Sequence, residues 1–343
     1  MLYFTTHFHL RISSVDFPAK RLTIVGSAGY CVSFTFDITR PFSPKIKATI
    51  VVVVLFFSSP TQAANTTGAF LKIPVGARQV GMGQAFTAVA NDVNSAWWNP
   101  AGLGRLGMRE FSATDAQLFG DMRFETLAYA QPVRSGALGL SVGYLSHKAI
   151  EGRGPNREKT GSFGASDMVL GMSYGRPYGA LHIGGTLKYL KSSIADASAT
   201  GAALDVGALM PTKVAGLTVG AALQNLGTGM RFIEERNPLP MSLSLGAAYQ
   251  TPFGTVSADL KREMADDRMS FSLGMEMQIL SALTARAGYQ KAAGTAFGTD
   301  QSSPLAGLAG GLGIRILGYT VDYSFTPMGE LGAAQRLSLT ARF

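Results

Sequence analysis

The chain ends in Arg336-Leu-Ser-Leu-Thr-Ala-Arg-Phe343, where apolar and polar side chains alternate strictly. A period of two is the pattern of a β-strand with one apolar and one polar face. The strand stops on an aromatic residue, as lipid-facing strands of bacterial outer-membrane barrels do at the membrane rim. We therefore interpret its apolar face as lipid-facing and as the signal that barrel-assembly machinery would bind: Leu337, Leu339, Ala341 and Phe343.

The same alternation recurs along residues 110–343, in segments near the ten residues that a tilted membrane strand needs. In residues 318–326, for example, Tyr319, Val321 and Tyr323 share one face. We count 14 such segments, and single-chain bacterial barrels require an even number of strands. The sequence therefore predicts an all-β fold, a transmembrane antiparallel β-barrel of about 14 strands, at 110–117, 123–133, 136–146, 166–176, 179–190, 201–211, 216–227, 239–251, 254–263, 269–279, 282–291, 306–316, 318–326 and 335–343.

The connections between these segments alternate in length. After every second segment the link is tight, as at Arg134-Ser135 and Pro252-Phe253, whereas most others are long and polar, as in 148–165 and 292–305. Short turns on one rim and longer loops on the other are typical of the periplasmic and extracellular sides of an outer-membrane barrel. In a soluble β-sandwich, nothing requires short and long connections to alternate in this way. We therefore expect the barrel in the outer membrane of a Gram-negative-type bacterium, surrounded by its lipid.

The first 63 residues do not have the barrel pattern. Lys45 and Lys47 precede the apolar run 48–57, and the small residues Thr61 and Ala63 follow at the −3 and −1 positions of a cleavage site. This order predicts a cleaved secretory signal peptide over residues 45–63, with a short buried strand as the alternative. Residues 1–44 are then a leader, either the product of an upstream start codon or a genuine extension.

Removal of residues 1–63 changes the bulk properties of the chain. The full sequence has 30 basic and 22 acidic side chains and a net charge of +8, and half of that excess lies in residues 1–63. The basic balance is therefore no argument for nucleic acid as a partner. The only cysteine, Cys31, leaves with the leader, so the mature chain has no thiol for a disulfide or a metal site.

A glycine-rich segment, residues 64–109, separates the signal peptide from the first strand. About eight strands is the limit for a barrel that its own side chains can fill, so a 14-stranded barrel leaves space in its lumen. We expect this segment to lie in the lumen as a hatch, with a helix over 85–90 and a type I turn at 99–102; a disordered periplasmic tail is the alternative. The hatch residues that we single out are Gly76, Arg78, Gly81, Gly83, Asp92, Trp97, Trp98, Asn99, Pro100 and Gly102.

Residues 68–103, GAFLKIPVGARQVGMGQAFTAVANDVNSAWWNPAGL, closely resemble the start of the PorV/PorQ family of outer-membrane proteins. That family is similar in architecture to the FadL long-chain fatty-acid transporters, and beyond residue 110 the resemblance is mostly one of architecture. It implies a 14-stranded barrel with a lumenal hatch. It also implies either a link to type IX secretion, with attachment of secreted cargo proteins, or passage of hydrophobic compounds.

No enzymatic chemistry stands out in the mature chain. Gly81-Met-Gly83 lacks the third glycine of a dinucleotide-binding loop, and His147 and His182 belong to no cluster with metal-ligand spacing. We therefore expect no enzyme, no cofactor and no metal site. Charges on the predicted inward faces are better candidates for function, either solvating the interior and anchoring the hatch or lining a substrate path: Lys188, Asp205, Asp259, Glu276, Arg286, Arg315, Asp322, Arg336 and Arg342.

Three functions stay open from the sequence. The first, slightly ahead, is a plugged barrel linked to protein secretion or cargo attachment, and the second is a FadL-like channel for uptake or export of hydrophobic small molecules. The third, a structural barrel or general porin, is disfavoured by the hatch. An apolar lumen pocket would favour transport, whereas a lateral gap with an ordered loop 148–165 would favour cargo binding.

Overall fold

The computed structural model describes residues 11–12, 20–26, 30–36, 66–148, 150–153, 158–232, 235–293, 307–329 and 332–343. The chain divides into two units, Met1–Ser58 and Ser59–Phe343. In the first unit, β1 (Arg11–Ile12), β2 (Lys20–Gly26) and β3 (Tyr30–Phe36) form an antiparallel sheet. The signal peptide predicted at 45–63 lies outside the described residues, so its cleavage stays a prediction.

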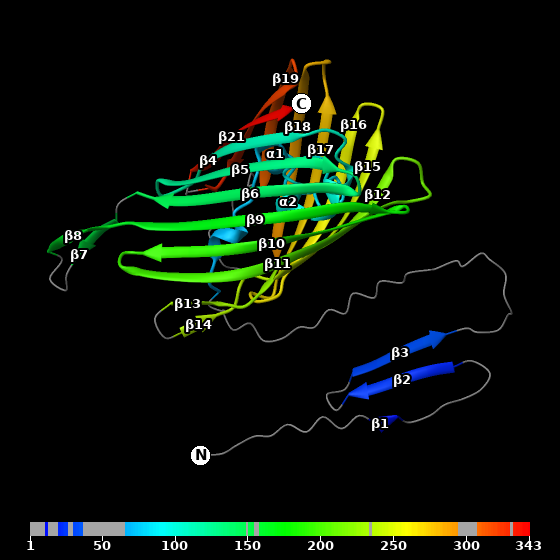
Figure 1. Ribbon diagram of the computed structural model, residues 1–343, viewed down its shortest axis with the longest axis horizontal. Coiled ribbons are helices and arrows are strands. Elements are labelled where there is room, and N and C mark those ends of the chain that lie inside the picture. Colours follow the sequence, from blue (N-terminus) through cyan, green and yellow to red (C-terminus); the bar gives the residue numbers. More distant parts are fainter. Residues whose placement is uncertain are drawn as a thin grey trace. The chain divides into compact units, whose positions relative to one another are not determined.

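In the second unit, 14 antiparallel strands of the described chain close into a barrel (Figure 1). The predicted fold class is confirmed, because β21 pairs back with β4 and Leu339 lies opposite Ala113 at the seam. Each predicted segment overlaps one strand of the wall. In order these are β4 (Glu110–Gln117), β5 (Met122–Val133), β6 (Gly136–His147), β9 (Ala165–Tyr178), β10 (Leu181–Ile194), β11 (Ala197–Pro211), β12 (Leu217–Gly227), β15 (Ser242–Thr251), β16 (Gly254–Glu263), β17 (Arg268–Gln278), β18 (Leu283–Ala293), β19 (Leu308–Ile316), β20 (Tyr319–Pro327) and β21 (Ala333–Arg342).

The two rims differ as the connections predict, with one correction. The turns after β5, β9, β11, β15, β17 and β19 have two to five residues. On the other rim, the connections hold two hairpins, β7 (Ile150–Arg153) with β8 (Lys159–Phe163) and β13 (Met230–Phe232) with β14 (Glu235–Asn237).

The correction concerns residues 191–200, which the sequence pattern left as a loop on the long-loop rim. They belong to β10 and β11, which pair until Ile194 lies opposite Ala197 and a two-residue turn joins them. Residues 191–200 are mostly small or polar on both faces, so they carry no apolar alternation from which a strand could be read. Backbone hydrogen bonding to the neighbouring strand extends the ladder regardless of that pattern.

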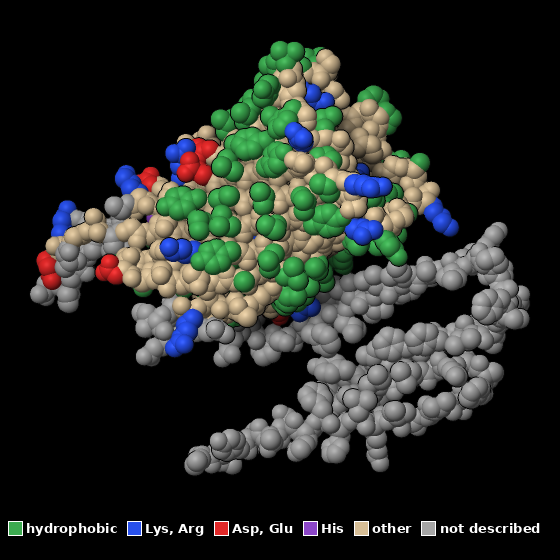
Figure 2. Space-filling view, in the orientation of Figure 1, with side chains coloured by type: hydrophobic (Ala, Val, Ile, Leu, Met, Phe, Trp, Pro, Cys, Tyr) green, Lys and Arg blue, Asp and Glu red, His purple; other side chains and the backbone are tan. Residues whose placement is uncertain are grey.

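The two faces of the wall have opposite character. On β21, the Leu337 side chain is 53% exposed, whereas its neighbours Arg336 and Ser338 are buried inside the barrel. The same alternation places apolar side chains of other strands on the outside, and Figure 2 shows them spread over the visible face of the wall. This is the arrangement of a membrane barrel, in which the outer face meets lipid and the inner face is polar.

Residues 66–109 pack against the inner faces of the strands, and Figure 1 shows their helices within the ring of the wall. They form four short helices, η1 (Ala69–Lys72), α1 (Ala77–Gly81), α2 (Ser95–Trp98) and η2 (Pro100–Arg105). No helix in the described part of the chain has the length and apolarity to cross a membrane. We call residues 66–109 the hatch segment below.

The local structure of the hatch segment corrects one expectation and extends another. The helix expected over 85–90 is absent: this stretch makes a single turn, in which the Ala90 N–H donates to the Phe86 carbonyl oxygen at 3.0 Å, and the Thr87 N–H donates to the Asp259 carboxylate of the wall, 2.7 Å away. The turn at 99–102 is present, with the Gly102 N–H donating to the Asn99 carbonyl oxygen at 2.9 Å. It continues as the 3₁₀ helix η2, which the Asn99 side chain caps.

The lipid-facing assignment of β21 is testable by placing a charge there. We expect Leu337→Lys, in the middle of the strand, to lower the free energy of unfolding by about 2–4 kcal/mol, the cost of a lysine near the bilayer midplane. Leu317→Lys is the matched control, because Leu317 is 93% exposed in a short turn. Denaturant unfolding of both variants in lipid vesicles measures the difference, and equal stability would refute the lipid-facing assignment.

Candidate functional site

The hatch segment runs through the lumen from the long-loop rim to the short-turn rim. At its start, the Thr67 N–H donates to the Pro238 carbonyl oxygen between β14 and β15, 3.0 Å away. Lys72 then pairs with Asp266 in the turn between β16 and β17. At its end, the Arg109 N–H donates to the carbonyl oxygen of Phe343, the last residue of the chain, at 3.1 Å.

Backbone-to-backbone contact fixes the hatch segment against the wall. A Cβ atom on Gly83, where φ is +60°, would lie 2.5 Å from the Tyr289 backbone nitrogen of β18. On the wall, a Cβ atom on Gly184 of β10 would lie 2.4 Å from the Pro100 carbonyl. Neither position has room for a side chain, because real Cβ atoms do not approach other heavy atoms that closely. Glycines on both partners therefore let the plug and the wall touch directly.

An ion-pair network joins the hatch segment to strands β17, β18 and β20. Glu276 accepts hydrogen bonds from the Arg78 side chain at 2.7 and 2.8 Å and from Arg286 Nε at 2.7 Å. Arg78 Nη1 also donates to Asp92 at 2.8 Å, and Arg286 Nη1 donates to Asp322 at 2.7 Å. We call these five residues the latch. Two hatch residues and three lumen charges, chosen separately from the sequence, therefore meet in one network.

The pKa of Arg78 shows how the latch balances its charges. Burial disfavours the charged guanidinium, but the carboxylates of Glu276 and Asp92 outweigh that effect and raise its pKa well above the usual value. Breaking a buried pair leaves an uncompensated charge, which costs far more than an exposed pair contributes. The latch is therefore a strong restraint on the position of α1.

The other predicted lumen charges lie elsewhere. Lys188 and Asp205 form a second buried pair, 2.6 Å apart, on β10 and β11. Asp259 binds the backbone of the hatch segment at Thr87, as described above. Arg315 is not buried with the others, since its side chain is exposed at the short-turn rim, where the strand leaves the packed interior.

The predicted hatch residues with bulky side chains all pack inside the hatch or against the wall. Trp98 donates its indole N–H to the Val75 carbonyl oxygen at 3.0 Å and packs edge-on against Phe86. Asn99 Nδ2 donates to the Thr87 and Ala208 carbonyl oxygens, the second of which belongs to β11. Of the predicted glycines, Gly81, Gly83 and Gly102 lie against backbone atoms, whereas Gly76 lies against the Gln79 side chain; Gly76 and Gly83 have positive φ angles.

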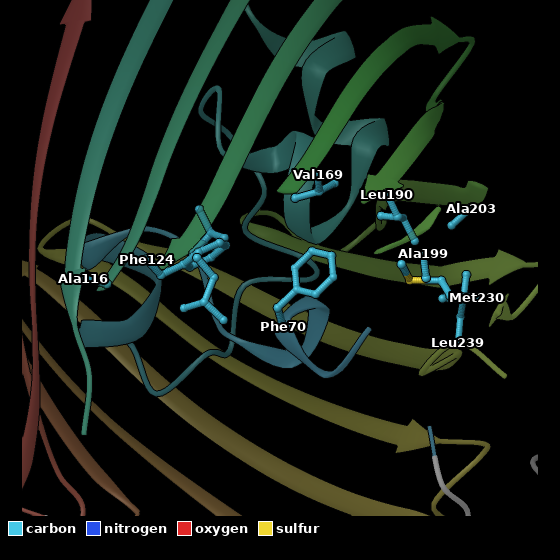
Figure 3. Close-up of a cluster of buried hydrophobic side chains, with 11 residues drawn as sticks. Phe70, Ala116, Phe124, Val169, Leu190, Ala199, Ala203, Met230 and Leu239 are labelled. Carbon is cyan, nitrogen blue, oxygen red and sulfur yellow. The ribbon is translucent and has the colours of Figure 1, made fainter. Parts of the chain in front are cut away.

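On the long-loop side of the latch, the inner wall is apolar. Phe70 of η1 lies between Ala116 and Phe124 on one side and Val169, Leu190 and Met230 on the other (Figure 3). We call these side chains the apolar cluster, together with the remaining buried members Val75, Leu145, Ala199, Ala203 and Leu239. A cavity of about 40 Å³ beside it has a mixed lining, with apolar side chains such as Phe70 and Phe124 and polar ones such as Lys188, Gln224 and Lys261.

Sequence reasoning missed the apolar cluster, although a signal for it was present. In β6, β9 and β10, strict alternation breaks at the pairs Tyr144-Leu145, Val169-Leu170 and Tyr189-Leu190. One member of each pair faces lipid and the other is buried in the lumen. Val169 and Leu190 are direct register partners, so two of these breaks lie side by side on the inner wall.

The short-turn side of the latch has the opposite character. A cavity of about 440 Å³ there is lined mostly by charged and polar side chains, among them Arg78, Arg105, Glu276 and Arg315. Burial lowers the pKa of Arg105, whose guanidinium donates to the Val89 carbonyl oxygen at 3.2 Å. The lumen thus holds the packed apolar cluster and a polar cavity, which we call the polar vestibule, with the latch between them.

The latch can be tested through the release of the hatch segment. We expect Glu276→Gln to raise the rate of tryptic cleavage after Arg78 and Arg105 at least about tenfold, because about 1.4 kcal/mol of lost restraint raises the open population tenfold. Mass spectrometry of the fragments measures that rate while the barrel stays folded. Glu125→Gln, at an exposed carboxylate on β5, is the control. Equal cleavage of both variants would contradict a restraining latch.

The barrel resembles solved outer-membrane channels in fold. The toluene transporter TodX of Pseudomonas putida superposes with a TM-score of 0.56 at 14% identity, covering 82% of this chain and 98% of that one. A FadL homologue of Pseudomonas aeruginosa gives 0.53 at 12% identity, covering 79% and 98%. Identities this low show a shared fold and nothing finer, and a search of curated protein sequences finds no match.

A family model identifies the group to which the chain belongs. The match spans residues 56–231, just over half of the 343 residues, and covers the whole hatch segment and the wall strands from β4 to β12. It does not bear on the PorV/PorQ resemblance, which stays a prediction. The chain is a member of the uncharacterised protein family UPF0164.

Proposed function

We propose that this protein is an outer-membrane channel for hydrophobic small molecules, which bind at the apolar cluster. The observation that carries the proposal is an apolar inner wall, with Leu145, Val169 and Leu190 buried in the lumen. A water-filled barrel presents polar side chains at such positions. An apolar surface in the lumen is stable when an apolar group covers it and excludes water. In this conformation Phe70 is that group (Figure 3).

An apolar ligand could take the place of the Phe70 side chain in the apolar cluster. Full burial of a phenylalanine side chain stabilises by about 1.5–3 kcal/mol. An apolar ligand of similar size gains a comparable amount on the same surface, so the exchange costs little. The ion pairs that hold the rest of the hatch segment are separate from Phe70, because the latch lies at α1 and η1 precedes it. Movement of η1, with loss of the Lys72–Asp266 pair at the long-loop rim, would open the apolar cluster without breaking the latch.

The present conformation is closed. The cavity of about 40 Å³ beside Phe70 is too small for an organic ligand, since a drug-sized pocket has at least about 300 Å³. The polar vestibule on the other side of the latch is larger, at about 440 Å³. Passage therefore requires η1 to leave the apolar cluster first and the hatch segment to shift afterwards.

The fold comparisons support this proposal over the cargo-linked one. The two solved structures described above are a toluene transporter and a FadL homologue, and both share the barrel architecture. The secretion function implied by the PorV/PorQ resemblance stays a prediction. Of its two discriminating features, a lateral gap has no counterpart among the described wall strands, which close into a barrel, whereas the described part of loop 148–165 does hold the β7–β8 hairpin.

Trp97 and Trp98 allow a direct test, because they are the only tryptophans of the chain and both lie in the hatch segment, shielded from lipid. We expect 1-bromododecane to quench their fluorescence in the protein reconstituted in nanodiscs, since quenching by bromine needs near-contact. Phe70→Ala should increase that quenching several-fold, because it empties the apolar cluster. Leu190→Asp should abolish it.

Leu187→Ala is the matched control, three residues from Leu190 on the lipid face of the same strand. It should quench like the unchanged protein. Absence of quenching in both the unchanged protein and Phe70→Ala would overturn the channel proposal. A rise in quenching with Leu187→Ala equal to that with Phe70→Ala would show that the bromoalkane reports the bilayer instead of the lumen.

A further inference from the structure

One buried arginine of the lumen has no counter-charge. Arg336 of β21 faces the interior and is 4% exposed, and its Nε and Nη1 atoms have no hydrogen-bond partner. No ion pair joins it to any carboxylate of the described residues. Arg78 and Arg286, the two arginines of the latch, each have two carboxylate partners. Arg336 is therefore the exception among the buried lumen arginines that the structure describes.

Two hydroxyl groups beside Arg336 are unpartnered as well. Ser324 of β20 lies directly opposite Arg336 in the β-ladder, is 0% exposed and has no partner for its Oγ. Thr326 lies two residues further along β20, on the same face, and its Oγ1 is also without a partner. Directly opposite residues on one face have Cβ atoms about 5 Å apart, and diagonal neighbours are within reach of a long side chain. The three groups therefore form one cluster.

The nearest acidic residue along β20 does not neutralise this cluster. Asp322 is two residues before Ser324, and its Oδ1 accepts the hydrogen bond of Arg286 at 2.7 Å within the latch. A buried charge without a partner costs several kcal/mol, and unpaired buried hydroxyls add to that cost. These three unsatisfied groups occupy neighbouring positions on one face of the wall, and all of them can donate to a single acceptor.

We propose that Arg336, Ser324 and Thr326 form a binding site for a carboxylate or phosphate group inside the barrel. The planar guanidinium donates two parallel hydrogen bonds to two oxygens of such a group, and the hydroxyls of Ser324 and Thr326 donate to the remaining lone pairs. The anion is either a free ion or the head group of an amphipathic molecule. The second source fits the surroundings, since Ala116, opposite Arg336 on β4, belongs to the apolar cluster.

This inference is separable from the channel proposal. The site would bind a free anion even if no hydrophobic molecule crosses the barrel, because its three groups need only an acceptor. Quenching of Trp97 and Trp98 tests the apolar cluster, whereas anion binding tests β20 and β21. Failure of one therefore leaves the other standing.

The test is fluorine NMR with trifluoroacetate as the probe. The full barrel is refolded from urea in buffer without carboxylate or phosphate, and the probe line width is followed as protein is added. We expect broadening with the unchanged protein and at least tenfold weaker binding with Arg336→Met. Arg315→Met is the matched control, because Arg315 is an exposed lumen arginine without the buried hydroxyls. It should bind like the unchanged protein.

Competition then identifies the source of the anion. Displacement of the probe by acetate or inorganic phosphate at millimolar concentration alone indicates a free ion, and displacement by dodecyl phosphate at concentrations far lower indicates an amphipathic head group. Ser324→Ala keeps the charge of Arg336 and should weaken binding of the probe several-fold. It therefore replaces Arg336→Met as the test variant if Arg336→Met does not fold. Equal broadening by all variants, or none by the unchanged protein, would overturn the proposal.

Discussion

The structure depends on one constraint, the hydrogen bonding of the backbone in lipid. Lipid offers no partner for a free N–H or C=O group, so a sheet in a membrane must close on itself. Here closure is achieved by β21 and β4, the last and the first strands of the wall. Fourteen strands are too many for the wall side chains to fill the interior. Closure therefore creates a lumen, and the hatch segment occupies part of it.

Two kinds of contact hold the hatch segment in the lumen. Glycines such as Gly83 bring its backbone against the wall, and the latch fixes its position through Arg78 and Glu276. Neither kind of contact reaches η1, which is held by Phe70 in the apolar cluster and by Lys72 at the long-loop rim. Apolar packing can be exchanged for a ligand at little cost, whereas buried ion pairs cannot. The plug therefore has a firmly held part and a replaceable part.

The candidate site follows from where the inner wall departs from the rule for membrane barrels. Most inward side chains are polar and find partners, as Lys188 and Asp205 do. Two regions differ, the apolar cluster around Phe70 and the unpaired Arg336 beside Ser324. Both lie on the long-loop half of the lumen, and they share a boundary at Ala116. Apolar surface beside an uncompensated charge suits an amphipathic molecule better than water.

The sequence by itself determined the wall. Alternation as in Leu337 and Ser338 follows from the pleat of a strand, which is a local property, so all strands could be read without the structure. Alternation cannot identify residues 191–200 as strand, because they are paired without an apolar face, and it cannot show that 85–90 makes only one turn, bound to the wall through Thr87 and Asp259. It also cannot show that Arg78 meets Glu276 or that Arg336 meets no acid, because those partners are far apart in the chain. Only the tertiary structure decided these contacts, since barrel closure and the path of the hatch segment set which inward side chains face each other.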